Sequence, residues 1–306
     1  MLAAWATIKI LTIFLVMVLC MSRLLITGAS GYLGQRVSYF AQQTIIWDKV
    51  YSQTWRNLPT AGEHVACDLA DQARLEVLLT QIQPTAIIHT AAVTPAMGPA
   101  MTDQALWAVN VQASATLARW AAQHQARFVH VSSDAVWGGR EAAYTESDVP
   151  APIHPYGASK AAGEAVVAAL DPQAAIARTS LLYGQNPLDP NTTMALAMLR
   201  GERHGVLFTD ELRCPVFVED VAQALIELAQ KPSLYGIFHL VGPQILSRFE
   251  LGQALLEWNG IDSTGLPAGI TAASGLRRPS RVVADNRTTQ SQLSTILRSI
   301  DDVTRR

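Results

Sequence analysis

The sequence predicts an α/β protein built on a doubly wound parallel sheet, and two observations support this class. Short β-branched or apolar segments alternate with longer alanine-rich segments of helical length, which is the pattern of successive βαβ units. A glycine-rich turn at residues 28–34 joins the first such pair. After Arg178 prolines interrupt the alternation, which indicates a smaller second lobe.

The individual elements follow from this alternation. We expect strands at Arg23–Thr27, Lys49–Thr54, Ala86–Thr90, Arg127–Ser132, Ala174–Arg178 and Gly236–Val241. We expect helices at Tyr32–Gln42, Gln72–Gln81, Gln104–Gln123, Tyr156–Leu170 and Val218–Gln230. Several of these helices have apolar residues three or four positions apart, so that one face of each can pack on the sheet.

The composition is that of a globular chain of enzyme size. Of 306 residues, 49% are hydrophobic, which suffices for one large domain or for two lobes that share a core. Because 23 Lys+Arg stand against 25 Asp+Glu, the charge indicates no nucleic-acid partner. Cys20, Cys67 and Cys214 form no CxxC pair and the seven histidines form no HExxH motif, so we expect a reducing compartment and no metal.

The N-terminal segment, residues 1–22, is almost wholly apolar from Ile8 to Met21. This run is shorter than the roughly 20 residues that span a bilayer, and Val18-Leu19-Cys20 offers no small-residue cleavage site. Only Met21 and Ser22 separate the run from the first strand. We therefore expect that Met21 is the initiator and that the protein is cytoplasmic; a membrane anchor formed by this segment is the alternative.

The glycine-rich turn has the context of a dinucleotide-phosphate site. It follows the first strand and opens the first helix with the spacing GxxGxxG. Glycine permits unusual backbone angles, and because it has no side chain it lets a pyrophosphate approach the backbone closely. A helix N-terminus offers free N–H groups and a dipole that favours an anion. A glycine turn without a ligand is the alternative. We thus predict a Rossmann-type fold whose cofactor contacts Gly28, Ser30, Gly31, Tyr32, Leu33 and Gly34.

The end of the second strand bears on the choice of nicotinamide cofactor. Proteins that prefer NAD usually place a carboxylate there, which binds the ribose hydroxyls and repels a 2′-phosphate. Here the strand runs into Thr54-Trp55-Arg56, and Asp48 stands at its start. Arg56 is placed to pair with a 2′-phosphate, so we expect NADP, with NAD as the alternative.

The most specific pattern is a serine followed by a tyrosine and a lysine. Ser133 directly follows the strand expected at Arg127–Ser132. Tyr156 and Lys160 stand four residues apart on a predicted helix, which puts both on one face. A positive Lys160 would lower the pKa of the phenol and hold the cofactor ribose while Tyr156 exchanges a proton. With Ser133 they would polarise a ketone as hydride arrives. An exposed Tyr and Lys are the chance alternative.

With these motifs the chain resembles the dTDP-4-dehydrorhamnose reductase group of the extended short-chain dehydrogenase/reductase superfamily. The similarity is strongest in Ser133-Asp134 with Val136-Trp137-Gly138, in Tyr156–Glu164, in Arg178–Gly184, in Cys214–Ala222 and in Arg278–Arg281. It implies reduction of a keto nucleotide sugar, with hydride from NADPH or NADH and Tyr156 as proton donor. We expect a dinucleotide-binding core at 23–180 and a substrate lobe at 181–306, of which 215–242 returns to the core. Two copies of the chain could form a homodimer, which the sequence does not decide.

The resemblance assigns further cofactor contacts. Asp68, between Cys67 and Leu69 at the end of a further predicted strand that follows Lys49–Thr54, would contact the adenine. A helix N-cap is an equally ordinary role for such an aspartate. Ala91 and Ala92 follow the strand expected at Ala86–Thr90, and their small side chains would let the backbone approach the dinucleotide.

Five other residues near the expected site are an asparagine, a histidine and three arginines, and the resemblance suggests a role for some of them. Asn110 matches a family asparagine that braces the active site, whereas His89 is interpreted as a core histidine without a chemical role. Arg277, Arg278 and Arg281 could clamp a diphosphate or could simply be solvated.

Two other functions stay open. One is a nucleotide-sugar epimerase or dehydratase with bound NAD, although a dehydratase would need an acidic pair and Ala135 supplies no second acid beside Asp134. The other is a non-catalytic NADP-binding subunit, because the chain also resembles the methionine adenosyltransferase regulatory subunit. The intact Ser133, Tyr156 and Lys160 favour an enzyme.

Overall fold

The computed structural model describes residues 21–275 and 278–305. The segment 1–20, on which the predictions of a late start or an anchor depend, lies outside the described residues, as does Arg277. In the described part of the chain no helix has the length and apolar character needed to cross a bilayer.

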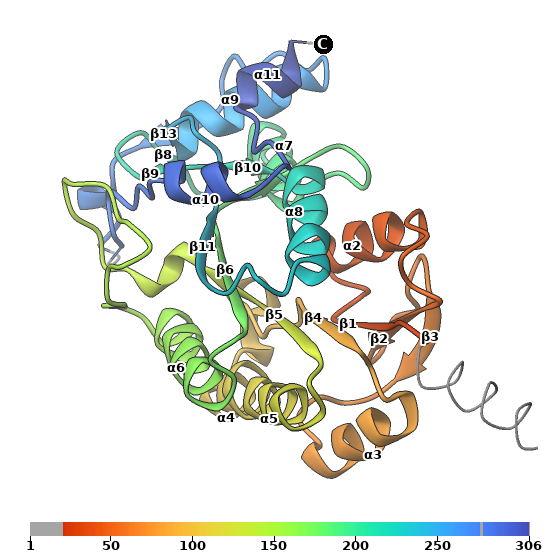
Figure 1. Cartoon of the computed structure of the whole chain (residues 1–306). Helices are drawn as coiled ribbons and strands as arrows, with labels where there is room; N and C mark the ends of the chain where they lie inside the picture. Colours follow the sequence, from red (N-terminus) through yellow and green to blue (C-terminus); the bar gives the residue numbers. More distant parts are fainter. Residues whose placement is uncertain (1–20, 276–277, 306) are drawn as a thin grey trace, which may run out of the picture.

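A seven-stranded parallel sheet forms the centre of the molecule (Figure 1). The strand order is β11-β6-β5-β4-β1-β2-β3, so the winding direction reverses between β1 and β4. This is the predicted doubly wound, Rossmann-type fold. The strands are β1 (Arg23–Thr27), β2 (Lys49–Thr54), β3 (Glu63–Ala66), β4 (Ala86–His89), β5 (Arg127–Ser133), β6 (Ala175–Thr179) and β11 (Gly236–Leu240).

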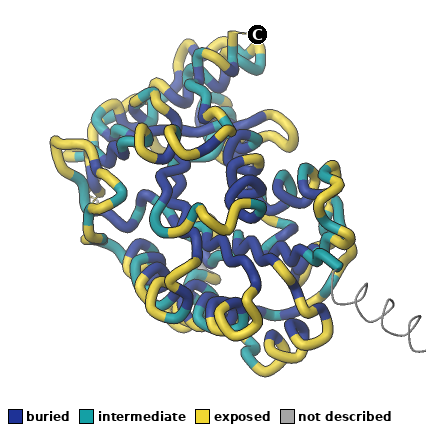
Figure 2. The backbone as a smooth tube through the Cα atoms, in the orientation of Figure 1, coloured by how far each residue is buried: buried dark blue, intermediate teal, exposed yellow. Residues whose placement is uncertain are grey.

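Helices cover both faces of this sheet. Helices α2 (Tyr32–Gln42) and α8 (Val218–Gln230) pack on one face, and α3 (Gln72–Ile82), α5 (Ser114–His124) and α6 (Pro155–Leu170) pack on the other. Figure 2 shows the strands buried between the two layers, while the outward sides of the helices are exposed. Each element that the sequence predicted is present within one residue at either end, apart from the helix expected at 104–123.

The exception is a helix whose pitch changes along its length. In place of one regular helix, the chain forms α4 (Asp103–Ala105), a π-helix η2 (Leu106–Ala113) and then α5. Such wide turns occur frequently at functional sites. The buried Asn110 lies inside η2, and its contacts, described below, give the local reason for the departure.

Short elements make up most of the remaining chain. Three two-stranded sheets pair β10 (Val216–Phe217) with β7 (Leu182–Tyr183), β12 (Leu246–Ser247) with β9 (Leu212–Arg213), and β13 (Ala268–Gly269) with β8 (Leu207–Phe208). Helices α7 (Pro190–Leu199), α9 (Arg248–Trp258) and α11 (Ile300–Thr304) gather on one side of the central sheet, at the top of Figure 1. The other short helices are α10 (Arg287–Gln292), η1 (Pro95–Ala100), η3 (Asp134–Val136) and η4 (Thr271–Ser274).

The last part of the chain, residues 281–305, returns to the body of the molecule, and we call it the C-terminal strap. Its Val283 carbonyl accepts a hydrogen bond of 2.8 Å from the Tyr144 amide. Its Arg298 forms an ion pair of 2.6 Å with Asp220 of α8. The strap thus connects the segment after β5, which contains Tyr144, to helix α8.

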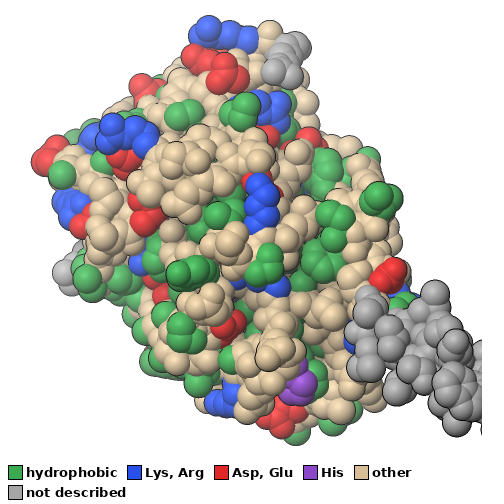
Figure 3. Space-filling view, viewed as in Figure 1, with side chains coloured by type: hydrophobic (Ala, Val, Ile, Leu, Met, Phe, Trp, Pro, Cys, Tyr) green, Lys and Arg blue, Asp and Glu red, His purple; other side chains and the backbone are tan. Residues whose placement is uncertain are grey.

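The surface mixes both signs of charge. On the face in Figure 3, Lys and Arg side chains are interspersed with Asp and Glu. Exposed ion pairs such as Arg140–Asp148 at 2.6 Å and Lys49–Glu63 at 3.3 Å illustrate this mixture. A surface of this kind produces no extended field of one sign over that face.

Candidate active site

The glycine loop lies between the ends of β1 and β4, where the winding direction reverses. Gly28 has φ +70°, and a Cβ atom there would lie 2.6 Å from the Cα of Ala91, so only glycine fits. A Cβ on Gly34 would lie 2.1 Å from the Gly28 carbonyl oxygen. The Gly31 amide donates to that same carbonyl at 2.9 Å. The loop is therefore packed against both β4 and its own helix.

The start of α2 suits an anion. The helix has no side-chain cap at Gly31 and no acid in its first turn, so its first N–H groups and its dipole are available to a phosphate. The side chain of Leu33 is buried in the core, which leaves its backbone as the part that can face a ligand. The half-buried Ser30 is held through its carbonyl, which accepts from Gln35 Nε2 at 2.8 Å.

A buried glutamine that the sequence analysis missed holds the loop in place. Gln53 is 2% exposed; its Oε1 accepts from the Gly28 amide at 3.0 Å, and its Nε2 donates to the Cys67 carbonyl at 2.6 Å. Its backbone carbonyl accepts from the Ala29 amide at 2.9 Å. The sequence offers no signal for this role, because Gln53 stands between two other polar residues, Ser52 and Thr54, in β2.

The carboxyl end of β2 carries a hydroxyl where NAD-preferring proteins have an acid. Thr54 is buried, and its Oγ1 is hydrogen-bonded to His64 Nε2 of β3 at 2.9 Å. Arg56 lies two residues beyond the strand and is exposed. The side chain of Arg56 is thus accessible to a ligand at this edge of the sheet.

The segment after β3 separates the two roles considered for Asp68. Asp71, rather than Asp68, is the N-cap of α3, since its side chain accepts from the Arg74 amide at 3.1 Å. Asp68 is half-buried and accepts from the Ala70 amide at 3.0 Å. Leu69 is buried in the core. The N-cap interpretation of Asp68 is therefore wrong, and its carboxylate stabilises the preceding turn.

Asn110 joins three elements around the site. Its Oδ1 accepts from the Val93 amide at 2.8 Å and its Nδ2 donates to the Val93 carbonyl at 3.0 Å, which fixes the segment that begins with the half-buried Ala92. The same Nδ2 donates to Ser159 Oγ at 2.9 Å. Ser159 Oγ in turn donates to the Tyr156 carbonyl at 2.8 Å. Asn110 thus braces the active-site helix, as the resemblance implied.

His89 is a satisfied core histidine, as predicted. Its Nδ1 is hydrogen-bonded to Thr27 Oγ1 at 2.6 Å and its Nε2 to Ser114 Oγ at 3.1 Å. Burial lowers its pKa to about 3, and the charge of Lys160 adds to this effect. The ring is therefore neutral at physiological pH.

The three predicted catalytic residues lie at the end of β5 and on the first turns of α6, which packs against β5. Ser133 caps η3, and its Oγ accepts from the Ala135 amide at 3.2 Å. Tyr156 lies in the first turn of α6, close enough to Ser133 for that hydroxyl to lower its pKa. Lys160, one turn later, is 1% exposed, and its Nζ donates to the Val131 carbonyl of β5 at 2.7 Å.

Burial dominates the protonation of this set. It raises the pKa of Tyr156 to about 12, against the hydrogen bond from Ser133, which lowers it. It lowers the pKa of Lys160 to about 8, against the attraction of Glu164. The expectation that Lys160 makes this phenol more acidic is wrong, because burial raises the pKa of Tyr156 and the charge of Lys160 is not among the causes that oppose this rise. At neutral pH the phenol keeps its proton.

The arginines that the sequence suggested as a diphosphate clamp are engaged within the chain. Arg278 is paired with Glu211, with Nε 2.7 Å from Oε2, and Arg281 Nε donates to the Glu141 carbonyl at 2.9 Å. Arg277 lies outside the described residues. Neither of the two described side chains is merely solvated.

Two other features lie apart from this set. A cavity of about 860 Å³ lies between α8 and the C-terminal strap, but its Arg298 and Arg305 are already paired with Asp220 and Asp301. Among residues 21–275 and 278–305 no three His, Cys, Asp or Glu side chains gather as metal ligands would.

Comparison with known proteins identifies relatives along nearly the whole chain. The model of the RmlD substrate binding domain matches residues 21–304. Methionine adenosyltransferase 2 subunit beta of Rattus norvegicus is 32% identical over 272 residues, which is 86% of this chain and 80% of that protein. dTDP-4-dehydrorhamnose reductase of Aggregatibacter actinomycetemcomitans is 29% identical over 243 residues, which is 78% of this chain and 79% of that protein.

Solved structures agree with this result. The NADP complex of dTDP-4-dehydrorhamnose reductase from Bacillus anthracis has a TM-score of 0.77 at 24% identity and covers 92% of this chain and 97% of its own. A hypothetical dTDP-4-dehydrorhamnose reductase from Sulfolobus tokodaii has a TM-score of 0.76 at 27% identity, with 92% and 98% covered. The chain therefore belongs to the RmlD substrate binding domain family, whose Rossmann-type fold it has, and the resemblance derived from its motifs is confirmed.

Proposed function

We propose that the protein is an NADPH-dependent reductase that converts a keto group of a nucleotide sugar to the alcohol, with NADH as the alternative donor. The observation that carries this proposal is the convergence of Ser133, Tyr156 and Lys160 at the end of β5. They lie beside the reversal point of the sheet, where open α/β folds bind their ligands. The relatives named as dTDP-4-dehydrorhamnose reductases support the substrate class.

The residues of the glycine loop fit a dinucleotide. The bare Cα of Gly31 and the uncapped start of α2 would hold the pyrophosphate, and Asp68 would reach the adenine. The exposed Arg56, with no acid in the strand that precedes it, would pair with the 2′-phosphate of NADP. When bound, the reduced nicotinamide supplies the hydride.

The side chains of the chain itself handle the oxygen of the substrate. Tyr156, protonated at neutral pH, donates its proton to the carbonyl oxygen as that oxygen becomes an alkoxide. Ser133 donates a hydrogen bond to the same oxygen and so stabilises the developing charge. Lys160, one turn further along α6, would hold the ribose of the bound cofactor. One hydride on carbon and one proton on oxygen complete the alcohol.

Two other functions are discriminated by this site. A dehydratase is disfavoured because Asp134 accepts a hydrogen bond of 2.6 Å from Ser180 Oγ and is followed in sequence by Ala135 rather than by a second acid. A non-catalytic subunit is the second candidate, because the similarity to methionine adenosyltransferase 2 subunit beta favours it. Both candidates predict no net consumption of NADPH.

The test is a turnover assay of the full chain with dTDP-linked and UDP-linked 4-keto sugars, followed by NADPH absorbance. We expect NADPH consumption, and a loss of about 10²- to 10⁴-fold in kcat for Tyr156→Phe with unchanged NADPH affinity. Product formed without net NADPH loss would indicate an epimerase. No turnover with any keto sugar, together with tight NADPH binding, would favour the non-catalytic subunit.

A further inference from the structure

A histidine caps the helix that carries the catalytic tyrosine. His154 is the N-cap of α6, and its Nδ1 accepts a hydrogen bond of 3.0 Å from the Gly157 amide. Serine, threonine, aspartate and asparagine are the usual residues at such a position, because one side-chain acceptor is enough to pair the amide. The imidazole of His154 therefore brings a second polar atom, Nε2, that the cap does not need.

The cap determines which nitrogen of the ring carries the proton. Because Nδ1 accepts a hydrogen bond, the neutral ring has its proton on Nε2. Burial lowers the pKa of His154 below its usual value, which keeps the ring neutral at physiological pH. Nε2 is therefore an N–H donor, and no other residue in the described part of the chain is hydrogen-bonded to it.

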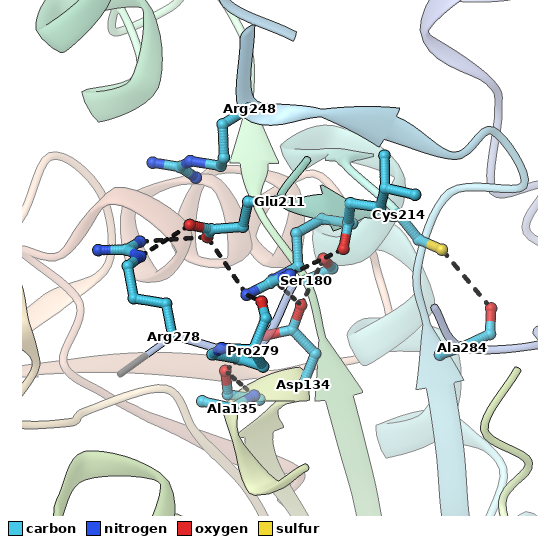
Figure 4. A network of polar contacts seen from close by, with 12 residues as sticks. Asp134, Ala135, Ser180, Glu211, Cys214, Arg248, Arg278, Pro279 and Ala284 are labelled. Carbon is cyan, nitrogen blue, oxygen red and sulfur yellow. Dashed lines mark hydrogen bonds and ion pairs between the residues drawn. The ribbon is translucent and has the colours of Figure 1, made fainter. Parts of the chain in front are cut away.

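The carboxylate whose charge acts on His154 has its oxygens in use. This group is Asp134, whose Oδ2 accepts from Ser180 Oγ at 2.6 Å and whose Oδ1 accepts from Ser133 Oγ at 3.3 Å. Figure 4 shows the side chains of Asp134 and Ser180 directed toward each other. Asp134 thus acts on the ring through its charge and is not the acceptor for Nε2.

The cations near His154 offer no acceptor either. The charges of Arg213 and Arg278 lower the pKa of His154 further, and a guanidinium group has donors only. Arg278 is bound to Glu211, as Figure 4 shows, with Nε 2.7 Å from Oε2. The N–H group of Nε2 therefore stays available to a ligand.

His154 lies beside the reacting groups. Its ring stacks on that of Tyr156, with the ring centroids 6.4 Å apart and the planes 17° from parallel. The charge of Asp134, which follows Ser133 directly, acts on both rings. The side chain of His154 is only half-buried, so a ligand can reach it. The available donor is thus next to the place where the proposed function puts the keto group.

A donor at this place has to be paired when a substrate excludes water. A buried N–H group without an acceptor costs free energy, and a site built to hydrogen-bond a hydroxyl strongly rejects an analogue that lacks it. In a keto sugar the carbon atoms next to the keto group ordinarily carry hydroxyl groups. The oxygen of such a hydroxyl would pair the Nε2 proton while the keto oxygen contacts Tyr156.

We infer that His154 determines substrate specificity, because its Nε2–H donates a hydrogen bond to the hydroxyl oxygen on a sugar carbon next to the keto group. The inference rests on the proposed function and refines it, since it selects a hydroxylated keto sugar over the corresponding deoxy sugar. Nδ1 keeps its place in the cap at the same time. One side chain thus holds both the ligand and the start of the catalytic helix.

The test compares two dTDP-linked 4-keto sugars that differ only in the 3-hydroxyl, with the full chain and NADPH. We expect the natural chain to prefer the 3-hydroxy sugar about 10- to 100-fold in kcat/KM. His154→Ser, which keeps a capping oxygen but is too short to reach the sugar, should abolish this preference. His204→Ser, which changes an exposed histidine in the loop after α7, is the matched control and should keep it.

A second variant separates the hydrogen bond to the sugar from the cap. His154→Ala loses both, so its midpoint of thermal unfolding should fall below that of His154→Ser. The preference for the 3-hydroxy sugar should nevertheless be lost equally in the two variants. A preference that is lost in His154→Ala but kept in His154→Ser would assign the effect to the cap and overturn the inference.

Binding measurements distinguish this inference from the proposed function. Calorimetric titration of dTDP-linked 4-hydroxy sugars, with and without the 3-hydroxyl, into the full chain saturated with NADP does not depend on turnover. If neither keto sugar is reduced but the natural chain binds the 3-hydroxy sugar more tightly and His154→Ser does not, the inference stands and the reductase proposal fails. If the natural chain does not discriminate, or His154→Ser discriminates equally well, the inference is wrong even where NADPH is oxidised.

Discussion

Asn110 Nδ2 donates a hydrogen bond of 2.9 Å to Ser159 Oγ, across 49 residues of sequence. This bond connects the π-helix η2 to the residue that precedes Lys160 on α6. Because Ser159 also binds the Tyr156 carbonyl at 2.8 Å, the position of the phenol depends on an amide that touches neither cofactor nor substrate in our proposal. Asn110 is a positioning residue.

Asn110→Ala should therefore damage both stability and turnover. Three buried hydrogen bonds are lost and the Val93 backbone groups are left unpaired, so we expect the free energy of unfolding to fall by about 2–4 kcal/mol. Urea unfolding measures this. The kcat should fall more than KM rises, since the phenol is misplaced. Equal kcat for variant and natural chain would contradict the positioning role.

Arg56 should determine the preference for NADPH. Arg56→Ala removes the exposed guanidinium after β2, and we expect KM for NADPH to rise about 10-fold with NADH unaffected. Arg119→Ala, an exposed arginine on α5, is the control. If the ratio of kcat/KM values for the two cofactors does not change, the 2′-phosphate is held by other groups.

The pH profile should report Lys160. Burial lowers its pKa to about 8, so the ammonium is lost as pH rises through that value, and reduction should decline on the alkaline side near pH 8 because the charged donor that holds the cofactor ribose is then lost. Tyr156, with its pKa raised to about 12, stays protonated there. The measurement is kcat against pH from 6 to 10. An unchanged rate up to pH 10 would show that the lysine charge is not needed.

Buried histidines should make the fold sensitive to acid. The two ring nitrogens of His130 have no hydrogen-bond partner among the described residues, and burial lowers its pKa well below the usual value. Because the folded pKa lies below the unfolded value of about 6.5, the unfolded chain takes up the proton first, and stability is lost as pH falls below about 6.5. Between pH 6.5 and 5 this amounts to about 2 kcal/mol for such a group.

His130→Phe should remove that loss without opening a cavity. We expect the difference in unfolding free energy between pH 7.5 and pH 5, measured in urea, to shrink by about 2 kcal/mol. His204→Gln changes an exposed histidine and should leave the difference as it was. The same pH difference in all three proteins would mean that other groups cause the acid sensitivity.

Local patterns made much of the fold predictable. The bounds of β1 and α2 follow from an apolar run, a glycine turn and a helical repeat that are adjacent in sequence. Tyr156 and Lys160 could be paired because their spacing alone places them on one helical face. The pitch of the helix at 103–124 was not predictable, since it depends on Asn110 meeting Val93 and Ser159.

The parts of the site that were missed depend on distant contacts. Nothing near Gln53 in sequence indicates that its amide holds the glycine loop, because its partners are Gly28 and Cys67. Likewise, the engagement of Arg278 could not be foreseen, since it depends on Glu211, 67 residues away. Burial decided the phenol pKa, and burial is a property of the folded chain.

The C-terminal strap has a consequence for how this protein can be recombined. Tyr144, which follows β5, is held by Val283 of the strap, so a piece cut anywhere between them carries only half of that contact. A chimera with a single junction near residue 180 would combine the Tyr144 loop of one protein with the C-terminal strap of another, which is not complementary to that loop. Exchange of specificity between relatives therefore calls for transplanting discontinuous segments, with the loop at residue 144 moved alongside the tail.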